Sequence, residues 1–328
     1  MSDELKKYLT EGGRATVSRR QFLKLVGLGL ATMLIPPKII RTALAKSETR
    51  LEPRKRRAVK TPFDLVMAKG ADPATNTRKA VEALGGISRF VKEGDVVVVK
   101  PNIGWDRAPE QAATTEPAVV ETLVKMCVEA GAKTVKVFDN TCNNAKRCYQ
   151  NSGIRDAAKR AGAQVAFVDK WRFFPGKFPE GSALEDWPLY RDAAECDCLI
   201  NAPVAKHHGL TRLTLSLKNL MGACGGNRGR IHWDIDQKLA ELALFLKPDL
   251  TVIDATRILL RHGPQGGNLE DVEPKNTVIA GADPVLADAC ACSLFGLKPT
   301  DIGHIRKAAE MGVGSLDIAK AKVKEIKT

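Results

Sequence analysis

An unbroken apolar run at 95–100, Asp-Val-Val-Val-Val-Lys, constrains the fold of this chain more than any other feature. A strand with one face in water alternates apolar and polar residues, whereas a strand covered on both faces is apolar throughout. Four consecutive valines favour a strand over a helix because their branched side chains fit a pleated surface. The run therefore predicts a central strand of a mainly parallel sheet that helices cover on both faces.

Strand and helix patterns alternate along the rest of the chain. Strands are expected at 64–70, 95–100, 133–140, 164–169, 196–204, 249–255 and 277–281. Helices are expected at 73–91, 116–132, 145–162, 235–247, 285–297 and 301–311. This order predicts an α/β fold with an open, mainly parallel, Rossmann-like sheet. Residues 46–328 are expected to form one such domain, with a flap or hairpin insertion at 170–191, where aromatic residues, proline and glycine are frequent.

The first 45 residues have the pattern of an export signal. The segment Ser-Arg-Arg-Gln-Phe-Leu-Lys at 18–24 is followed by an apolar run at 25–35 and by Ala43-Leu44-Ala45. The apolar run is shorter than the roughly 20 residues that a membrane-spanning helix needs. The pattern predicts a twin-arginine signal peptide, the twin-arginine translocase as a partner and cleavage near Ala45. The protein is then periplasmic or otherwise extracytoplasmic. An uncleaved amphipathic anchor is the alternative.

The remaining chain is moderately basic. The whole sequence has 51 Lys and Arg against 38 Asp and Glu, and the part after residue 45 keeps 43 against 35, a net charge of +8. A basic run at 54–57 is expected to be a solvated arm. Export and an aromatic content of 5% argue against nucleic acid as a partner. The surplus charge favours an anionic small molecule or an anionic membrane surface.

Residues 200–232 hold the densest group of chemically active side chains. Three of the five histidines lie there, and Lys206, His207 and His208 directly follow a strand that Pro203 is expected to end. Ligands of open α/β sheets bind beyond the carboxyl ends of the strands. Lys206, His207 and His208 are therefore candidate catalytic residues, and Asp254 at another strand end is expected to orient a histidine or act as a base.

Cations and amides near the same strand ends predict an anion site. The glycines at 225, 226 and 229 are expected to leave backbone N–H groups free, which together with Lys and Arg would bind phosphate or carboxylate. A solvated basic loop is the alternative for this segment. The candidate ligand-binding residues are Lys100, Asn102, Lys218, Asn219, Arg228, Arg230 and Arg257. The sequence contains no GxGxxG and no P-loop motif, so no nucleotide fingerprint is found.

Three cysteines are candidate metal ligands. If the sheet is arranged as expected, Cys142, Cys148 and Cys224 meet at its carboxyl edge. A histidine there, His232 or else His207 or His208, then completes a four-ligand set for an iron–sulfur cluster or a transition metal. The alternative is a Cys142–Cys148 disulfide with Cys224 as a free thiol. The other cysteines are expected to be buried in the core: Cys127, Cys196, Cys198, Cys290 and Cys292. Strand periodicity predicts that Cys196 and Cys198 share one face.

Several segments resemble the family called domain of unknown function 362. They include VVVVKPNIG at 96–104, FDNTCNN at 138–144, INAPVAKHHGLTRLTLSLKNLMG at 200–222 and RGRIH at 228–232. Many members of that family carry a ferredoxin-like segment that binds two iron–sulfur clusters. This chain has no C-x-x-C-x-x-C run, so the resemblance does not imply a ferredoxin-type cluster here.

Two functions follow from the sequence. The first is an exported oxidoreductase or electron-transfer protein that uses a metal or an iron–sulfur cluster to act on an anionic small molecule or to exchange electrons with a partner protein. The second is a metal-free α/β binding protein or enzyme for a phosphorylated or carboxylated small molecule, with the Cys142–Cys148 disulfide.

Overall fold

The valine run forms β2 (Val96–Pro101) inside a ten-stranded sheet. The computed structural model describes residues 50–328, so the predicted signal peptide and its cleavage position lie outside the described residues. The strand order is β12-β1-β11-β10-β7-β2-β3-β4, with β8 paired to β10 and β9 paired to β8. The strands are β1 (Leu65–Lys69), β3 (Thr134–Val137), β4 (Gln164–Val165), β7 (Cys198–Ala202), β8 (Val204–His208), β9 (Arg212–Thr214), β10 (Leu250–Leu259), β11 (Val272–Gly281) and β12 (Val323–Lys327).

Most of the strands run in the same direction. The pairs β2–β3, β2–β7, β3–β4 and β7–β10 are parallel, as are β8–β10 and β1–β12. Two strands run against the others: β11 is antiparallel to β10 and β1, and β9 is antiparallel to β8. The predicted α/β class with an open, mainly parallel sheet is therefore confirmed, with two reversed strands that the sequence prediction did not include.

Alternate residues of the central strands belong to two different cores. In β2, Val97 and Val99 pack in one cluster and Val98 in the other, and β7 divides Ile200 and Leu199 in the same way. Successive side chains of a strand point to opposite faces, so a strand between two helical layers has to be apolar at every position. This is the physical reason for the unbroken valine run.

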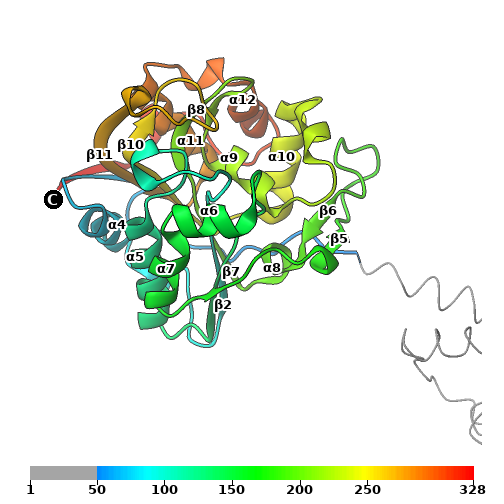
Figure 1. Cartoon of the computed structure of the whole chain (residues 1–328), viewed down its shortest axis with the longest axis horizontal. Helices are drawn as coiled ribbons and strands as arrows, with labels where there is room; N and C mark the ends of the chain where they lie inside the picture. The colour runs from blue at the N-terminus through cyan, green and yellow to red at the C-terminus, as the bar shows by residue number, and fades with distance from the viewer. Residues whose placement is uncertain (1–49) are drawn as a thin grey trace, which may run out of the picture. The chain divides into compact units, whose positions relative to one another are not determined.

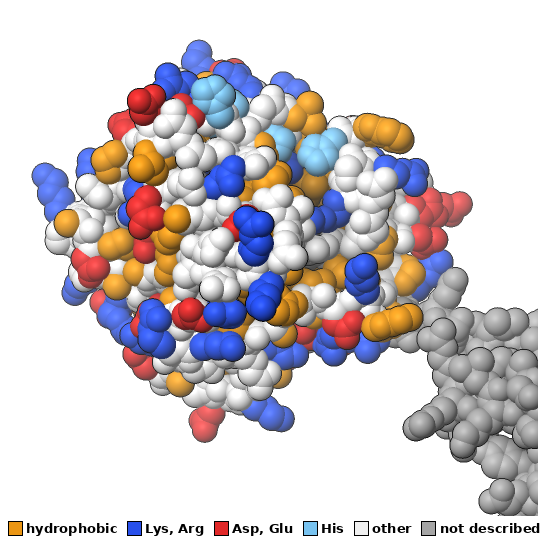
Figure 2. Space-filling model, viewed as in Figure 1, with side chains coloured by type: hydrophobic (Ala, Val, Ile, Leu, Met, Phe, Trp, Pro, Cys, Tyr) orange, Lys and Arg blue, Asp and Glu red, His pale blue; other side chains and the backbone are white. Residues whose placement is uncertain are grey.

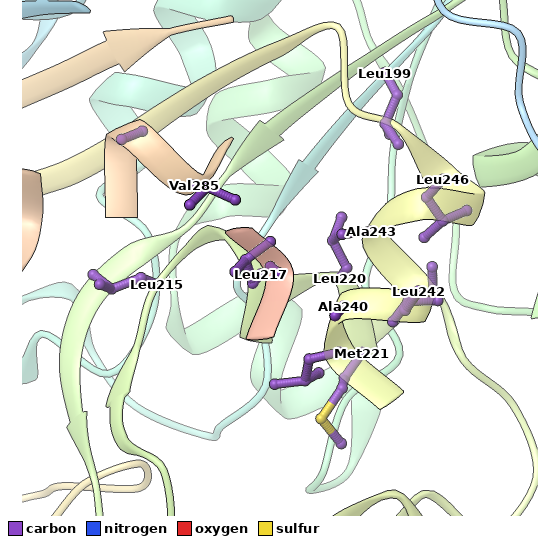
Figure 3. Packing of buried hydrophobic residues seen from close by; sticks show 14 of the residues in the cluster. Leu199, Leu215, Leu217, Leu220, Met221, Ala240, Leu242, Ala243, Leu246 and Val285 are labelled. Carbon is purple, nitrogen blue, oxygen red and sulfur yellow. The ribbon is translucent and has the colours of Figure 1, made fainter. Parts of the chain in front are cut away.

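Helices cover both faces of the sheet. One layer contains α4 (Pro73–Ala83), α5 (Pro117–Glu129), α6 (Ala145–Asn151) and α7 (Ile154–Arg160). The other contains α8 (Arg191–Glu195), α9 (Ser216–Asn219), α10 (Ile235–Leu246), α11 (Pro284–Cys292) and α12 (Gly303–Glu310). Figure 1 shows α4, α5 and α7 grouped on one side of the strands and α10 and α12 on the other. In the second layer the apolar side chains of α9 and the following 3-10 turn, η5 (Leu220–Ala223), lie against α10 (Figure 3).

Three sequence expectations about local structure are wrong. The helix expected at 145–162 is two helices, because Gly153 has a left-handed φ of 70° and caps α7. The residues expected to follow the strand ended by Pro203 form a strand of their own, β8. The basic arm is not solvated throughout: Arg54 is 3% exposed, and its guanidinium bonds the carboxylate of Asp249 at 2.7 Å and four backbone carbonyl oxygens.

The segment 170–191 contains a small antiparallel hairpin of β5 (Phe173–Pro175) and β6 (Pro188–Tyr190). It packs on the glycine-rich turn at 222–226, where the indole of Trp187 donates to the carbonyl oxygen of Gly225 at 3.2 Å. A Cβ on Gly225 would lie 2.6 Å from the ring of Phe173, so this contact requires glycine. Within residues 50–328, no helix has both the length and the apolar character of a membrane span.

Candidate functional site

A buried ion pair lies where β2 and β3 end. The ammonium of Lys100 is fully buried and donates to Asp139 Oδ1 at 2.9 Å and to the carbonyl oxygen of Pro101 at 3.0 Å. Burial lowers the pKa of Lys100, and the Asp139 carboxylate opposes that shift. The other carboxylate oxygen of Asp139 accepts from the backbone N–H of Ile103 at 2.6 Å. Both oxygens of this carboxylate are thus engaged within the protein.

Gly222 fits against this ion pair because it has no side chain. A Cβ at this position would lie 1.7 Å from Asp139 Oδ1 and 2.5 Å from Lys100 Nζ. The carbonyl oxygen of Gly222 accepts from the N–H of Asn140 at 3.0 Å. The turn after α9 is therefore seated directly on the end of β3.

Three asparagine amides join the strand ends to α9. Asn219 donates to Asn201 Oδ1 at 2.8 Å and to the carbonyl oxygen of Lys100 at 3.2 Å. Asn219 Oδ1 accepts from the amide of Asn102 at 3.1 Å. Asn201 in turn donates to the carbonyl oxygen of Ser216 at 2.9 Å. This network fixes α9 over the carboxyl ends of β2 and β7.

Lys206 is the second of three buried lysines, Lys100, Lys206 and Lys218, that together form what we call the lysine cluster. Its ammonium donates to the carbonyl oxygen of Ala113 at 2.5 Å and to Asn102 Oδ1 at 3.3 Å, and both acceptors are neutral. Burial lowers the pKa of Lys206 to about 7, against a weaker raising effect of Cys142 and Asp139. Lys206 therefore titrates near neutral pH, which is unusual for a lysine and typical of functional sites.

Lys218 differs from the other two lysines because it lacks an oxygen partner. It is 9% exposed, and the single acceptor of its ammonium among residues 50–328 is the thioether sulfur of Met221 at 3.0 Å. A thioether is a weak acceptor for a cation. Burial lowers the pKa of Lys218 to about 8, and the charge of Cys142 raises it in part. A buried ammonium with so weak a partner is costly for the folded protein.

Strand periodicity separates the two adjacent histidines. In β8, Lys206 and His208 point to one face, and His207 points to the other. His208 Nδ1 accepts from the N–H groups of Leu210 and Thr211 at 3.1 and 3.2 Å, so the ring proton is on Nε2. Burial lowers the pKa of His208 to about 3, so this imidazole is a neutral hydrogen-bond donor.

The other two predicted histidines hold the backbone nearby. His207 Nδ1 accepts from the N–H of Gly263 at 3.1 Å. His232 lies in η6 (Arg228–His232), with its Nδ1 3.2 Å from the carbonyl oxygen of Gly229. The rings of His232 and His208 are stacked, with centroids 6.1 Å apart. Figure 2 shows histidine side chains reaching the surface close together, near Lys and Arg side chains.

His304 belongs to this neighbourhood and was missed by the sequence analysis. It is fully buried in α12, and neither ring nitrogen has a hydrogen-bond partner in the described part of the chain. Burial, and to a lesser extent the charge of Lys218, lowers the pKa of His304 to about 3. A lone histidine 42 residues after His262, the nearest other histidine, carries no local signal. Asp139 and Asn201 were also not selected, although each is a polar residue in or just after an apolar strand.

The predicted four-ligand metal set does not form. Cys148 and Cys224 are both fully buried, and they pack in the two different hydrophobic clusters. No group of three His, Cys, Asp or Glu residues within 50–328 is arranged to hold a metal ion. The cysteines therefore do not fit an iron–sulfur cluster or a transition metal, because side-chain direction separates residues whose backbones lie near the same edge. His232 instead stacks on His208.

All eight cysteines are free thiols, so Cys142 and Cys148 are not joined in a disulfide. Cys142 is exposed and the other seven are buried. Burial raises the pKa of the Cys224 thiol to about 12. Cys196 and Cys198 pack in different clusters rather than on one face, because β7 begins only at Cys198.

Arg228 lies at the cluster, and Arg230 does not. The Arg228 guanidinium donates to the carbonyl oxygens of Asn140 and Thr141 at 2.6 and 2.7 Å and lies 3.9 Å from Cys142 Sγ. Arg230 is exposed and lies over the ring of Trp233. The glycine turn does not provide the expected free N–H groups at Gly225 and Gly229, whose N–H groups bond Pro188 O and Asn227 Oδ1.

Asp254 and Arg257 hold the start of α5 rather than a histidine. Asp254 Oδ2 accepts from the N–H of Glu116 at 2.7 Å, and its Oδ1 accepts from the N–H of Thr256 at 2.9 Å. Burial raises the pKa of Asp254 to about 6. Arg257 forms an ion pair with the carboxylate of Glu116. Asp254 Oδ2 and Arg257 thus both bond Glu116, the N-cap of α5, and among the described residues no histidine bonds Asp254, so its predicted role in orienting a histidine is wrong.

Two surface hollows adjoin the cluster. One, of about 210 Å³, is lined by Leu210–Arg212, His232, Ile235, Asp236, Asp301 and Gly303. It lies directly beside the His208–His232 pair and the start of α12. The other, of about 380 Å³, is lined by Arg230, Trp233 and the 183–188 segment among others. The buried lysines line neither hollow, and the smaller one is the nearer approach to His208.

Fold and site together define an α/β protein with a cationic, amide-lined cluster at the carboxyl edge of its sheet. The chain belongs to the family described as domain of unknown function 362 (DUF362), whose model matches residues 97–293. A thylakoid-associated protein of Synechocystis sp. is 25% identical to it over 246 residues, which are 72% of this chain and 74% of that protein.

A solved structure with some likeness is the lactate racemase apoprotein from Thermoanaerobacterium thermosaccharolyticum. The TM-score is 0.43 and the identity 11%, over 72% of this chain and 57% of that one, so the chain spans less than two thirds of it. A likeness at this level carries no argument about function. The fold class rests on the strand order itself.

Proposed function

We propose that this protein binds a small anionic molecule, through a carboxylate or phosphate group, at Lys218. The observation that carries the proposal is the buried Lys218 ammonium, whose single acceptor among the described residues is a thioether. An anionic oxygen at this position would supply the strong, charge-assisted hydrogen bond that the protein itself does not supply.

The charges around Lys218 support the same ligand. Lys100, Lys206 and Arg228 lie in the same cluster. The carboxylate that pairs with one of these cations is that of Asp139, which bonds Lys100. The cations thus outnumber the anions in a region shielded from water. Buried charges are costly unless they are paired, so a bound anion would offset the cost of burying these cations.

Neutral donors beside the lysines favour recognition of an oxygen-rich ligand. The N–H at Nε2 of His208 is a neutral donor, because Nδ1 accepts from two backbone N–H groups. Carboxylate and phosphate both satisfy these donors, and the experiment below separates them.

The test compares the thermal stability of the protein with malonate, phosphate and uncharged malonamide at constant ionic strength. A ligand that binds the folded state raises stability by RT ln(1 + [L]/Kd). Malonate or phosphate, whichever class the site accepts, is expected to stabilise the wild type, and malonamide is not. Lys218→Met should lose this response. Lys133→Met, an exposed lysine at the other edge of the sheet, should keep it. An equal response in the wild type and in Lys218→Met would contradict the proposal.

The proposal does not extend to a metal, an iron–sulfur cluster or an electron-transfer partner. The residues predicted as ligands, Cys142, Cys148, Cys224 and His232, do not converge in this structure. The second of the two functions inferred from the sequence, a metal-free protein for a carboxylated or phosphorylated molecule, is therefore the better supported, without its disulfide.

We further propose that the protein is exported by the twin-arginine translocase. The support is the segment SRRQFLK at 18–24 with the apolar run and the small residues that follow it. Replacing Arg19 and Arg20 by lysine should leave the full-length protein in the cytoplasm, as measured by fractionation and by the mass of the chain. Unchanged export of that variant would contradict the assignment.

A further inference from the structure

The larger surface hollow lies between the β5–β6 hairpin and the start of α10. Its volume is about 380 Å³, and small-molecule sites in proteins measure roughly 300 to 1,000 Å³. One wall is the segment 183–188, which leads into β6, and the other is the segment 226–233, which leads into α10. The three lysines of the lysine cluster do not line it, so this hollow is separate from the proposed anion site.

Both walls of this hollow are fixed to α10. The ammonium of Lys238 donates to the carbonyl oxygens of Arg230 and Trp233 at 3.0 and 2.5 Å. The buried carboxylate of Glu241 accepts from the backbone N–H groups at 183–184, at 3.0 and 2.9 Å. The shape of the hollow is therefore set by contacts within the protein, so a ligand would not have to order its walls on binding.

Two indole rings line the hollow. Trp233 is 70% exposed, although its backbone is held in place by Lys238. Trp187 lies on the opposite wall, and its Nε1 is already engaged by the carbonyl oxygen of Gly225. A tryptophan gains more than most side chains when its ring is covered, so an exposed indole on the wall of a preformed hollow favours a ligand with an apolar face.

The polar groups around the two rings are balanced in charge. Two acidic residues, Glu185 and Asp186, and two basic residues, Arg230 and Lys238, line the hollow. Within residues 50–328, no hydrogen bond or ion pair engages the Glu185 carboxylate, the Arg230 guanidinium or the amide nitrogen of Asn227. The hollow thus offers both donors and an acceptor without a net charge, which suits hydroxyl groups because each of them donates and accepts.

We propose that this hollow binds a neutral saccharide, with a pyranose ring stacked on the indole of Trp233 and hydroxyl groups bonded to Glu185 and Arg230. A pyranose ring carries C–H groups on its faces and hydroxyl groups on its rim, so one ligand satisfies the aromatic walls and the polar groups beside them. The balanced charge of the lining favours a neutral ligand here, in contrast to the lysine cluster. This site is additional to the proposed anion site and does not depend on it.

Calorimetric titration of the full-length protein with maltotriose, cellotriose and tri-N-acetylchitotriose tests the proposal. At least one of these neutral trisaccharides should bind with a Kd of about 1 mM or lower. Sorbitol has the hydroxyl groups of a hexose but no ring face to stack, so it should not bind. The affinity should not change with salt, because the ligand carries no charge. Absence of binding by all three trisaccharides overturns the inference, and so does binding that is lost when salt is added.

Two tryptophan variants locate the site. Trp233→Ala should weaken binding by about tenfold or more, because it removes the surface on which the ring stacks. Trp171→Ala is the matched control, since Trp171 is 80% exposed and does not line the hollow, and it should bind as the wild type does. Saturation-transfer NMR should label the ring C–H protons of the sugar in the wild type and in Trp171→Ala, and much less in Trp233→Ala. Equal affinity of the wild type and Trp233→Ala overturns the inference.

The saccharide site and the anion site should respond to different variants. Lys218→Met should keep the trisaccharide affinity while it loses the response to malonate or phosphate, and Trp233→Ala should do the reverse. Loss of saccharide binding in Lys218→Met would assign the sugar to the lysine cluster and overturn this inference. A polyproline peptide also packs on exposed tryptophan. Binding of that peptide at Trp233 in place of every trisaccharide would assign the hollow to a peptide and overturn the saccharide.

Discussion

Replacing Lys218 by methionine should make the protein more stable while it removes the anion site. The substitution keeps the length of the side chain and its contact with Met221, and it removes an ammonium that is 9% exposed and has no oxygen acceptor among residues 50–328. Methionine fills irregular buried space well because its side chain is flexible and apolar. The variant therefore separates the cost of the buried charge from the packing of the chain around it.

The size of the effect follows from the pKa. Burial lowers the pKa of Lys218 from 10.5 to about 8. One pKa unit corresponds to about 1.36 kcal/mol, so the buried ammonium costs the folded state about 3 kcal/mol at neutral pH. We expect Lys218→Met to raise the free energy of unfolding by up to that amount at pH 7.

The gain should depend on pH in a defined direction. Below pH 8 the lysine is protonated in both states, so the wild type bears the full cost. Between the folded pKa of about 8 and the unfolded pKa of 10.5, the unfolded chain holds a proton that the folded chain has released. Wild-type stability therefore rises with pH across this window, and the advantage of the variant shrinks toward pH 10.5.

Urea unfolding at a series of pH values measures both quantities. Lys133→Met removes an exposed lysine and should change the free energy of unfolding by no more than about 0.5 kcal/mol. A Lys218→Met variant that is less stable than the wild type at pH 7 would refute the reasoning. So would a difference between the two proteins that stays constant from pH 7 to pH 10.

Three further predictions concern the same cluster. Gly222→Ala should destabilise the protein by about 3 kcal/mol, as measured by thermal unfolding, because its Cβ would lie 1.7 Å from Asp139 Oδ1; an unchanged Tm would refute this. Asp139→Asn should cost about 3–5 kcal/mol in urea unfolding because it leaves the buried Lys100 ammonium without its carboxylate, and a cost below about 1 kcal/mol would count against it. His304→Leu should reduce the loss of stability as pH falls from 6.5 to 3, because burial lowers the pKa of His304 to about 3; an identical pH slope would contradict this.

Much of the sheet could be predicted from residue patterns. The apolar layers on the two faces of the sheet account for valine at every position of 96–99. Asp283 caps α11 and Pro284 is its first residue, as is usual for these residue types at the start of a helix. The reversed direction of β11 was also readable, since no helical pattern separates it from β10 and parallel neighbours need a crossover. The break between α6 and α7 at Gly153 could not be predicted, because a single glycine is tolerated inside many helices.

The site was predictable in position and less so in chemistry. Strand ends brought Lys100, Asn102 and Lys206 together as the carboxyl-edge rule expects, and α9 added Lys218 and Asn219. Which way a cysteine points depends on the register of its own turn, which a sequence pattern does not encode. For that reason Cys148 and Cys224 were assigned to one centre although the sheet separates them.

Arg54 binds the sheet at the amino ends of its strands, opposite the lysine cluster. Its guanidinium joins the residues that precede β7 to those that precede β10, two segments some fifty positions apart. Those partners lie together only because β7 and β10 are side by side, so the arm docks on the paired strands. A chain shortened past Arg54 would bury the Asp249 carboxylate without its cation. Expression boundaries for this protein should therefore begin well before that arginine.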